Sequence, residues 1–262
     1  MRLNHTRLYR YPVLVERYRI EKVILLYYLH KGYGRRVLRK GFNDYGVHDH
    51  NYPQFCPPNR PEYDIEHESG CVFLAFLLFE SFPEFFYGIE RAEIYELLIS
   101  HDIGEIKNGD VSDDGNRDEK KKDREEQAIF EHLFGGLTAG FDRLVENFGN
   151  FQKKNTILGR FAYCIDKIEA VLQGLIYEYE GYSGDAVYKK LRFGLSAQDQ
   201  QNIKSTGSNK LVDIWFESIR PKLERYDPTG KNNFFVEFVE TAIDYVRSDR
   251  FSPKEELETL DL

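Results

Sequence analysis

Three features are scarce in this chain, and each scarcity excludes a class of protein. The 262 residues include 3 cysteines, Cys56, Cys71 and Cys164, without CxxC spacing, so we expect no disulfide framework and a reducing compartment. The formal net charge of -8 argues against a protein that coats nucleic acid, because such a protein needs clustered Lys and Arg. No stretch is apolar for long enough to span a bilayer, and the N-terminal residues lack the apolar core of a signal peptide. We therefore expect a cytoplasmic protein that binds neither nucleic acid nor membrane.

The chain does contain helical periodicity, with little alternation of period two. Apolar residues recur at spacings of three and four over residues 157–175, and they nearly fill residues 72–78, which is typical of a buried helix. A loop-like region at residues 41–61 holds four of the nine prolines. The pattern predicts an all-α protein with helices near residues 13–29, 64–82, 89–106, 118–134, 155–175, 210–223 and 233–245.

Four residues of metal-ligand type lie on these helical segments: His67, the adjacent His101 and Asp102, and Asp166. Imidazole and carboxylate together suit intermediate divalent ions such as Mn, Fe, Co, Ni or Zn, whereas Mg and Ca prefer oxygen ligands alone. Four protein ligands around an octahedral ion leave about two positions for water and substrate, which is typical of a catalytic site. We therefore predict one divalent cation held by these four side chains.

Explanations of the same residues that involve no metal remain open from the sequence. A His-Asp pair such as His101 and Asp102 also occurs by chance on protein surfaces. Asp166 could pair with Arg160 or Lys167 instead of a metal. A carboxylate beside a dense apolar face needs some partner, however, and a cation is the better one.

Two further carboxylates follow the His-Asp pair. Glu105 lies three and four residues beyond Asp102 and His101, so a continuous helix would project all three to one side, where Glu105 could act on a metal-bound water as a base. Asp110 follows Asn108-Gly109 in a polar loop, where it could approach a leaving group or a sugar hydroxyl. Glu105 could also be a solvated helix end, and Asp110 an ordinary turn residue.

The order of these motifs resembles the HD-domain phosphohydrolases, and most closely the branch that contains bacterial 5'-deoxynucleotidases and HD-domain-containing protein 2. The resemblance covers roughly residues 60 to 182. It rests on Arg60-Pro61-Glu62 before His67, on His101-Asp102-Ile103-Gly104-Glu105 with Gly109-Asp110, on Arg124-Glu125-Glu126-Gln127-Ala128, and on Asp166-Lys167-Ile168-Glu169-Ala170-Val171-Leu172-Gln173.

The resemblance implies an all-helical bundle in which the residues matching His67, His101, Asp102 and Asp166 bind one divalent metal. It also implies that Glu105 and Asp110 act on the water and the substrate. Members of this branch hold the phosphate with an upstream arginine that is commonly followed by a tryptophan. Here Arg39-Lys40-Gly41-Phe42 matches that element with Phe42 in place of the tryptophan, and Arg36 is a second candidate.

The resulting expectation is an HD-domain core at residues 60–188, an N-terminal helix and proline-rich loop at 1–59 that pack on it, and a C-terminal helical extension at 189–262. The expected function is metal-dependent release of phosphate from a nucleotide, first of all a (deoxy)nucleoside 5'-monophosphate. A nucleoside triphosphate or guanosine polyphosphate substrate, and a non-catalytic regulator that binds metal and nucleotide, are the alternatives. A di-iron redox enzyme is disfavoured because it would need further helical histidines. The C-terminal extension could build the interface of a homodimer, cover the mouth of the active site or recognise a larger substrate.

Overall fold

The computed structural model describes residues 17, 20–21, 24, 64–103, 119–135, 139–180, 197–208, 210–231 and 233–258. Within these ranges the protein is helical and contains no strand, which confirms the all-α prediction. The helices are α2 (Asp64–Ser81), α3 (Arg91–Leu98), α4 (Glu119–Phe134), α5 (Ala139–Lys153), α6 (Ile157–Tyr179), α8 (Ala197–Thr206), α9 (Leu211–Tyr226), α10 (Phe234–Val246) and α11 (Pro253–Glu258). Of the expected helix at 13–29, the structure describes residues 17, 20, 21 and 24, which are helical.

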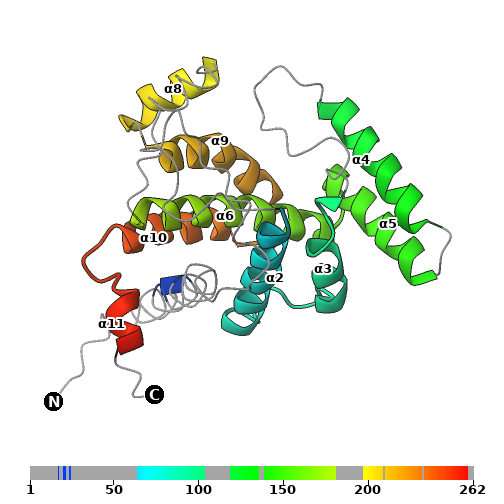
Figure 1. Cartoon of the computed structure of the whole chain (residues 1–262), viewed down its shortest axis with the longest axis horizontal. Helices are drawn as coiled ribbons and strands as arrows, with labels where there is room; N and C mark the ends of the chain where they lie inside the picture. The colour runs from blue at the N-terminus through cyan, green and yellow to red at the C-terminus, as the bar shows by residue number, and fades with distance from the viewer. Residues whose placement is uncertain are drawn as a thin grey trace, which may run out of the picture.

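Helix α6 is the centre of the molecule. Its apolar residues recur at spacings of three and four, so nearly every side can be buried against a neighbour. Thr156 is the N-cap of the helix, and its side-chain hydroxyl accepts a hydrogen bond from the backbone N–H of Gly159 at 3.0 Å. The helix contacts α2, α3, α5, α9 and α10. Figure 1 shows α6 running across the middle of the molecule, with α9 on one side and α2 and α3 on the other.

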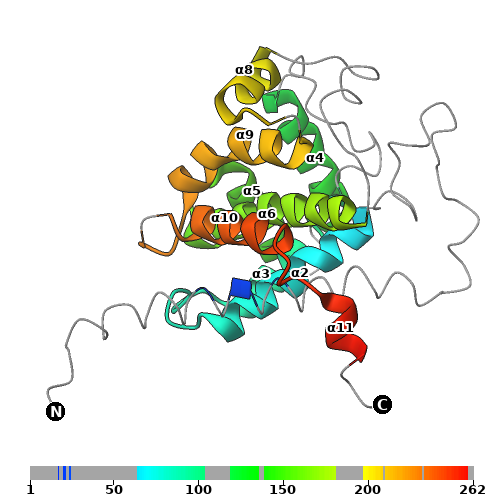
Figure 2. The same cartoon turned by 90° about the vertical axis from the view of Figure 1, so that its left-hand side faces the viewer.

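Aromatic rings join α2, α6 and α10 into one core. The ring of Phe161 on α6 lies 5.1 Å from Phe79 and 5.0 Å from Phe86, between centroids. Phe86 in turn lies 5.8 Å from Phe234 on α10. Such ring pairs contribute stability beyond the area that they bury. Helices from the C-terminal part of the chain therefore complete the same core that α2 and α6 begin, and Figure 2 shows α10 beside α6 above α2 and α3.

The helix predicted at residues 89–106 is wrong in its length, because α3 ends at Leu98. The hydroxyl of Ser100 donates to the carbonyl oxygen of Glu96 at 2.7 Å and lies 3.3 Å from that of Leu97. A side-chain hydroxyl therefore bonds to backbone carbonyls at the end of the helix. The next residues form a turn in which the N–H of Ile103 bonds to the carbonyl of Ser100 at 3.2 Å. His101 and Asp102 consequently lie on this turn instead of on a helix.

Three described helices were not predicted from sequence: α5, α8 and α11. Helix α5 contacts α4 on one side and α3 and α6 on the other, and α8 contacts α9. None of the described helices combines the length and the apolar character that crossing a bilayer would require. Helices α9 and α10 contact each other as well as α6, so the C-terminal helices cover the core.

Candidate metal centre

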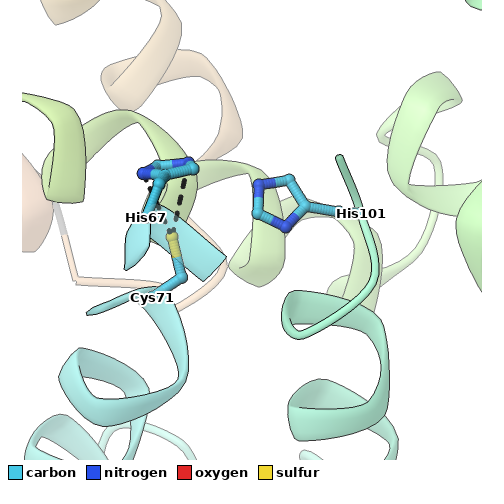
Figure 3. A group of neighbouring side chains, drawn as sticks. All are labelled: His67, Cys71 and His101. Atoms are coloured by element: carbon cyan, nitrogen blue, oxygen red, sulfur yellow. Dashed lines mark hydrogen bonds between the residues drawn. The ribbon is translucent and has the colours of Figure 1, made fainter. Parts of the chain in front are cut away.

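Three elements bring the four predicted ligands together. His67 lies in the first turn of α2, Asp166 lies in the middle of α6, and His101 and Asp102 lie on the turn after α3. Helix α6 packs against both α2 and α3, which sets the distances among the three elements. Figure 3 shows the imidazole rings of His67 and His101 next to each other, and their centroids are 5.2 Å apart. We call His67, His101, Asp102 and Asp166 the metal cluster.

The donor atoms of the metal cluster are close enough for one ion. The Nε2 atom of His67 lies 3.3 Å from Asp166 Oδ1 and 3.7 Å from Asp102 Oδ2. The Nε2 atom of His101 lies 3.4 Å from Asp102 Oδ1 and 4.0 Å from Asp166 Oδ1. Two ligands of one ion are at most about 4.4 Å apart, twice the metal–ligand distance. Each of these separations is below that limit.

Hydrogen bonds fix which imidazole nitrogen faces the cluster. Nδ1 of His101 lies 2.8 Å from the carbonyl oxygen of Leu98, which can only accept, so Nδ1 carries the proton and Nε2 keeps its lone pair. Nδ1 of His67 is hydrogen bonded to the carboxylate of Glu169, which requires a proton on Nδ1 in the same way. A neutral imidazole so held presents Nε2 as the ligand atom.

His101 provides the clearest sign of a missing partner. The residue is 4% exposed, and its Nε2 atom is buried with no hydrogen-bond partner in the described part of the chain. A buried polar atom without a partner costs free energy of about 1–3 kcal/mol. A cation at the centre of the metal cluster would satisfy this nitrogen, so the donor set fits a bound divalent ion.

The charges of the described residues support the same conclusion, because the two ligand carboxylates Asp102 and Asp166 meet one lysine there. Beside Asp102 and Asp166 lie two buried carboxylates, Glu169 and Glu68, and Oε1 of Glu68 accepts from the backbone N–H of Asp102 at 3.3 Å. The cation in contact is Lys167, whose Nζ lies 2.9 Å from Asp166 Oδ2. Lys167 thus binds one oxygen of Asp166 while Oδ1 faces the histidines. The lysine pairing that remained open from sequence is present, and it leaves the other oxygen for an ion.

The pKa values of the cluster follow from burial and from these neighbours. Burial alone would raise the pKa of Asp166, but Lys167 and the two histidines lower it below the usual 3.8. Burial opposes protonation of His67, yet its pKa is raised well above 6.5. The groups that raise the pKa of His67 are Cys71, then Glu169 and Asp166, while burial raises the pKa of the Cys71 thiol itself to about 12. The anionic surroundings favour positive charge on or beside this imidazole.

Cys71 is a further residue of metal-ligand type at the site. His67, Cys71 and His101 each offer a ligand atom within 4.8 Å of the others. Sγ of Cys71 lies 3.6 Å from Nε2 and 3.9 Å from Nδ1 of His67. A sulfur on the lone-pair axis of Nε2 would be much farther from Nδ1, so the sulfur lies against the ring, as Figure 3 shows. Cys71 therefore packs beneath His67, and its high pKa also disfavours the thiolate that a metal would require.

The remaining predicted site residues, Glu105, Asp110 and Arg39, lie outside the described residues, as does Arg36. Sequence reasoning gave no role to Glu169 or Glu68, and it considered Lys167 as a partner of Asp166 in place of a metal. The signal for Glu169 was available, because a residue three positions after Asp166 lies on the same face of a helix. The contact of Glu68 with Asp102 depends on how α2 and the turn after α3 meet, and their local sequences carry no signal for it.

Comparison with known proteins identifies the family. The model of the HD domain matches residues 54–206, which is more than half of the chain. The chain belongs to the HD domain family. Members of this family are typically metal-dependent phosphohydrolases, and the metal cluster lies within the matched residues. Neither the curated proteins nor the solved structures include a match to this HD protein.

Proposed function

We propose that this HD protein is a metal-dependent phosphohydrolase that releases phosphate from a nucleotide, with a (deoxy)nucleoside 5'-monophosphate as the first substrate to test. The observation that carries the proposal is the buried Nε2 of His101, which has no hydrogen-bond partner among the described residues and lies within 4.0 Å of two carboxylates. Such an arrangement is suited to a cation and costly without one. The choice of a monophosphate rests on the resemblance of the motifs to 5'-deoxynucleotidases.

In this proposal His67, His101, Asp102 and Asp166 hold one divalent ion of the Mn, Fe, Co, Ni or Zn type. Such an ion, when bound, polarises a phosphoryl oxygen and makes a water more acidic. The protein's part is to fix the donor atoms: Glu169 and the Leu98 carbonyl hold the two imidazoles, and Lys167 holds Asp166. Rigidly held donors lose little energy to reorganisation during the reaction.

The other steps are assigned to residues outside the described ranges. Glu105 orients the attacking water or takes its proton, because it lies four residues after His101 in the motif. Arg39 neutralises the phosphoryl oxygens, and Asp110 assists the leaving group or contacts the sugar. In-line displacement at phosphorus needs charge neutralisation and positioning above all, and these residues supply the charges.

A phosphate-release screen tests the proposal. The purified protein is incubated with nucleoside monophosphates, triphosphates, guanosine polyphosphates and simple phosphate esters, each with Mn²⁺, Co²⁺, Ni²⁺ or Mg²⁺. We expect release from a nucleotide that depends on the ion and that is lost, with the bound metal, in Asp102→Ala. Asp244→Ala, at an exposed position of α10, is the matched control and should retain both properties. Full turnover and full metal content in Asp102→Ala would refute the assignment of the site.

The same screen separates the alternatives. Release confined to triphosphates or guanosine polyphosphates would keep the mechanism and replace the substrate class. Tight nucleotide binding without turnover under any of the four ions would indicate a regulatory protein that retains the metal cluster for ligand sensing, and it would reject the hydrolase.

A further inference from the structure

Glu169 is a fully buried carboxylate beside the metal cluster. Its side chain has no exposed surface, and it lies one helical turn after Asp166 on α6. Burying a charged carboxylate is costly unless it is hydrogen bonded to a suitable partner. The side chain of His67 on α2 provides such a partner, through Nδ1. Glu169 therefore spans the contact between the two helices.

This hydrogen bond determines which nitrogen of His67 faces the site. A carboxylate accepts, so Nδ1 must donate, and the lone pair of the neutral ring is then on Nε2. Nε2 is also the nitrogen that lies 3.3 Å from Asp166 and 3.7 Å from Asp102. With the proton on Nε2 instead, His67 would present an N–H to the centre of the cluster and could not bind a cation there.

We propose that Glu169 is a positioning residue that selects the metal-binding tautomer of His67 and, through its negative charge, strengthens cation binding at the metal cluster. The inference rests on the proposed function of the same site. It assigns Glu169 no contact with the ion or the substrate, since its described contact is with the far side of the His67 ring. A carboxylate bound to a ligand imidazole makes the other nitrogen a stronger donor.

The other histidine shows why Glu169 is the residue to test. His101 is held by the backbone carbonyl of Leu98, a neutral acceptor that side-chain substitution leaves in place. His67 is held by a side chain, so its support can be changed without altering any of the four ligands. Glu169→Gln keeps the shape and an acceptor oxygen, and it removes the charge.

The test is a titration of metal-free protein with Co²⁺, followed by the visible absorption of the bound ion, in wild type, Glu169→Gln and Glu178→Gln. Glu178 is the matched control, because it is a partly buried glutamate near the end of the same helix that pairs with Arg247, away from the metal cluster. We expect Glu169→Gln to bind Co²⁺ about 10–100-fold more weakly and with a changed spectrum. Glu178→Gln should bind within about twofold of wild type with the same spectrum, because groups without shared partners act independently.

The outcomes distinguish this inference from the proposed function. If wild type binds no Co²⁺, the proposed function fails. If wild type binds Co²⁺ and Glu169→Gln binds it equally well with an unchanged spectrum, the role of Glu169 is rejected while the hydrolase stands.

A measurement on wild type covers the case in which Glu169→Gln does not fold. ¹⁵N-histidine NMR of the Zn²⁺-loaded protein, with His67 assigned through a His67→Asn sample, should show a proton on Nδ1 and the metal on Nε2. Metal on Nδ1 of His67 would overturn the inference.

Discussion

Helix α6 carries two polar clusters that resemble each other in composition and differ in charge. One is the metal cluster around Asp166. The other, which we call the arginine cluster, consists of Glu178 on α6, Lys210 and Asp213 at the start of α9, and Arg247 after α10. The two lie twelve residues apart on α6, or about 18 Å at 1.5 Å per residue.

The arginine cluster is balanced by the protein itself. The guanidinium of Arg247 donates from Nε to Glu178 Oε1 at 2.7 Å, from Nη2 to Oε2 at 2.9 Å and from Nη1 to Asp213 Oδ1 at 2.8 Å. Nζ of Lys210 lies 2.6 Å from Glu178. Two carboxylates thus face two cations with good geometry, and this arrangement joins three helices.

The metal cluster differs among the described residues, because its two ligand carboxylates, Asp102 and Asp166, meet one permanently charged cation, Lys167, which binds Asp166. Similar residue types therefore have different roles in the two clusters. The arginine cluster has matched charges and joins helices. The metal cluster has a surplus of negative charge among the described residues and the buried Nε2 of His101, and is suited to an ion. The comparison predicts that the two clusters respond to different perturbations.

The largest expected effect is on the metal cluster, from adding or removing the ion. Co²⁺ at a hundred times its dissociation constant should stabilise the protein by about 2.7 kcal/mol, which raises Tm by roughly 5–11 °C at this size. Differential scanning fluorimetry with Co²⁺ and with chelator measures the shift. It should disappear in His101→Ala, which lacks the buried Nε2, and persist in Arg247→Ala. An undiminished shift in His101→Ala would place the ion elsewhere.

A somewhat smaller effect is expected from breaking the arginine cluster. Arg247→Ala leaves Glu178 and Asp213 without their shared donor, at a cost of about 2 kcal/mol, or roughly 4–8 °C in Tm. Co²⁺ affinity should stay within about twofold of wild type, because the two clusters lie about 18 Å apart on α6. Lys222→Ala, at an exposed position of α9, is the control and should leave Tm nearly unchanged. Weaker Co²⁺ binding in Arg247→Ala would show that the clusters are coupled.

The sequence predicted which four residues lie close together, because residue type and spacing carry that information, and their binding of a metal stays a prediction. His67, the His101-Asp102 pair and Asp166 were selected as chemically suitable ligands within one ordered set of motifs. Their support was not predicted. Whether Glu169 reaches His67 depends on how α2 packs on α6 across 102 positions of the chain, and local patterns do not encode that contact.

Helix boundaries show the same limit. The apolar pattern of α6 and α10 predicted both helices well, because a dense apolar face dominates every other preference. The end of α3 was placed too late, because the chain after Leu98 forms tighter turns, in which the N–H of Ser100 bonds to the carbonyl of Leu97 and that of Ile103 to the carbonyl of Ser100. Helix α5 was missed although its apolar residues recur at helical spacing between Phe141 and Phe151. Gly140 and Gly149 lower its intrinsic helix propensity, and its contacts with α4 and α6 bury the apolar face.

The smallest expected effect is a pH dependence of the arginine cluster. Burial opposes ionisation of Glu178, but hydrogen bonds from Arg247 and Lys210 outweigh it and lower its pKa below the usual 4.5. A carboxyl whose folded pKa is lower than its unfolded one contributes stability above the unfolded value, and the contribution disappears as pH falls through the folded pKa. The Tm difference between wild type and Glu178→Gln should therefore be constant near neutral pH and shrink below pH 4.5. Thermal melts across that range measure it.

Glu240→Gln, which breaks the exposed pair with Arg220, is the control and should give a much smaller difference at every pH, because solvent screens such pairs. A difference for Glu178→Gln that grows on acidification would contradict the sign and the pairing on which the comparison of the two clusters depends.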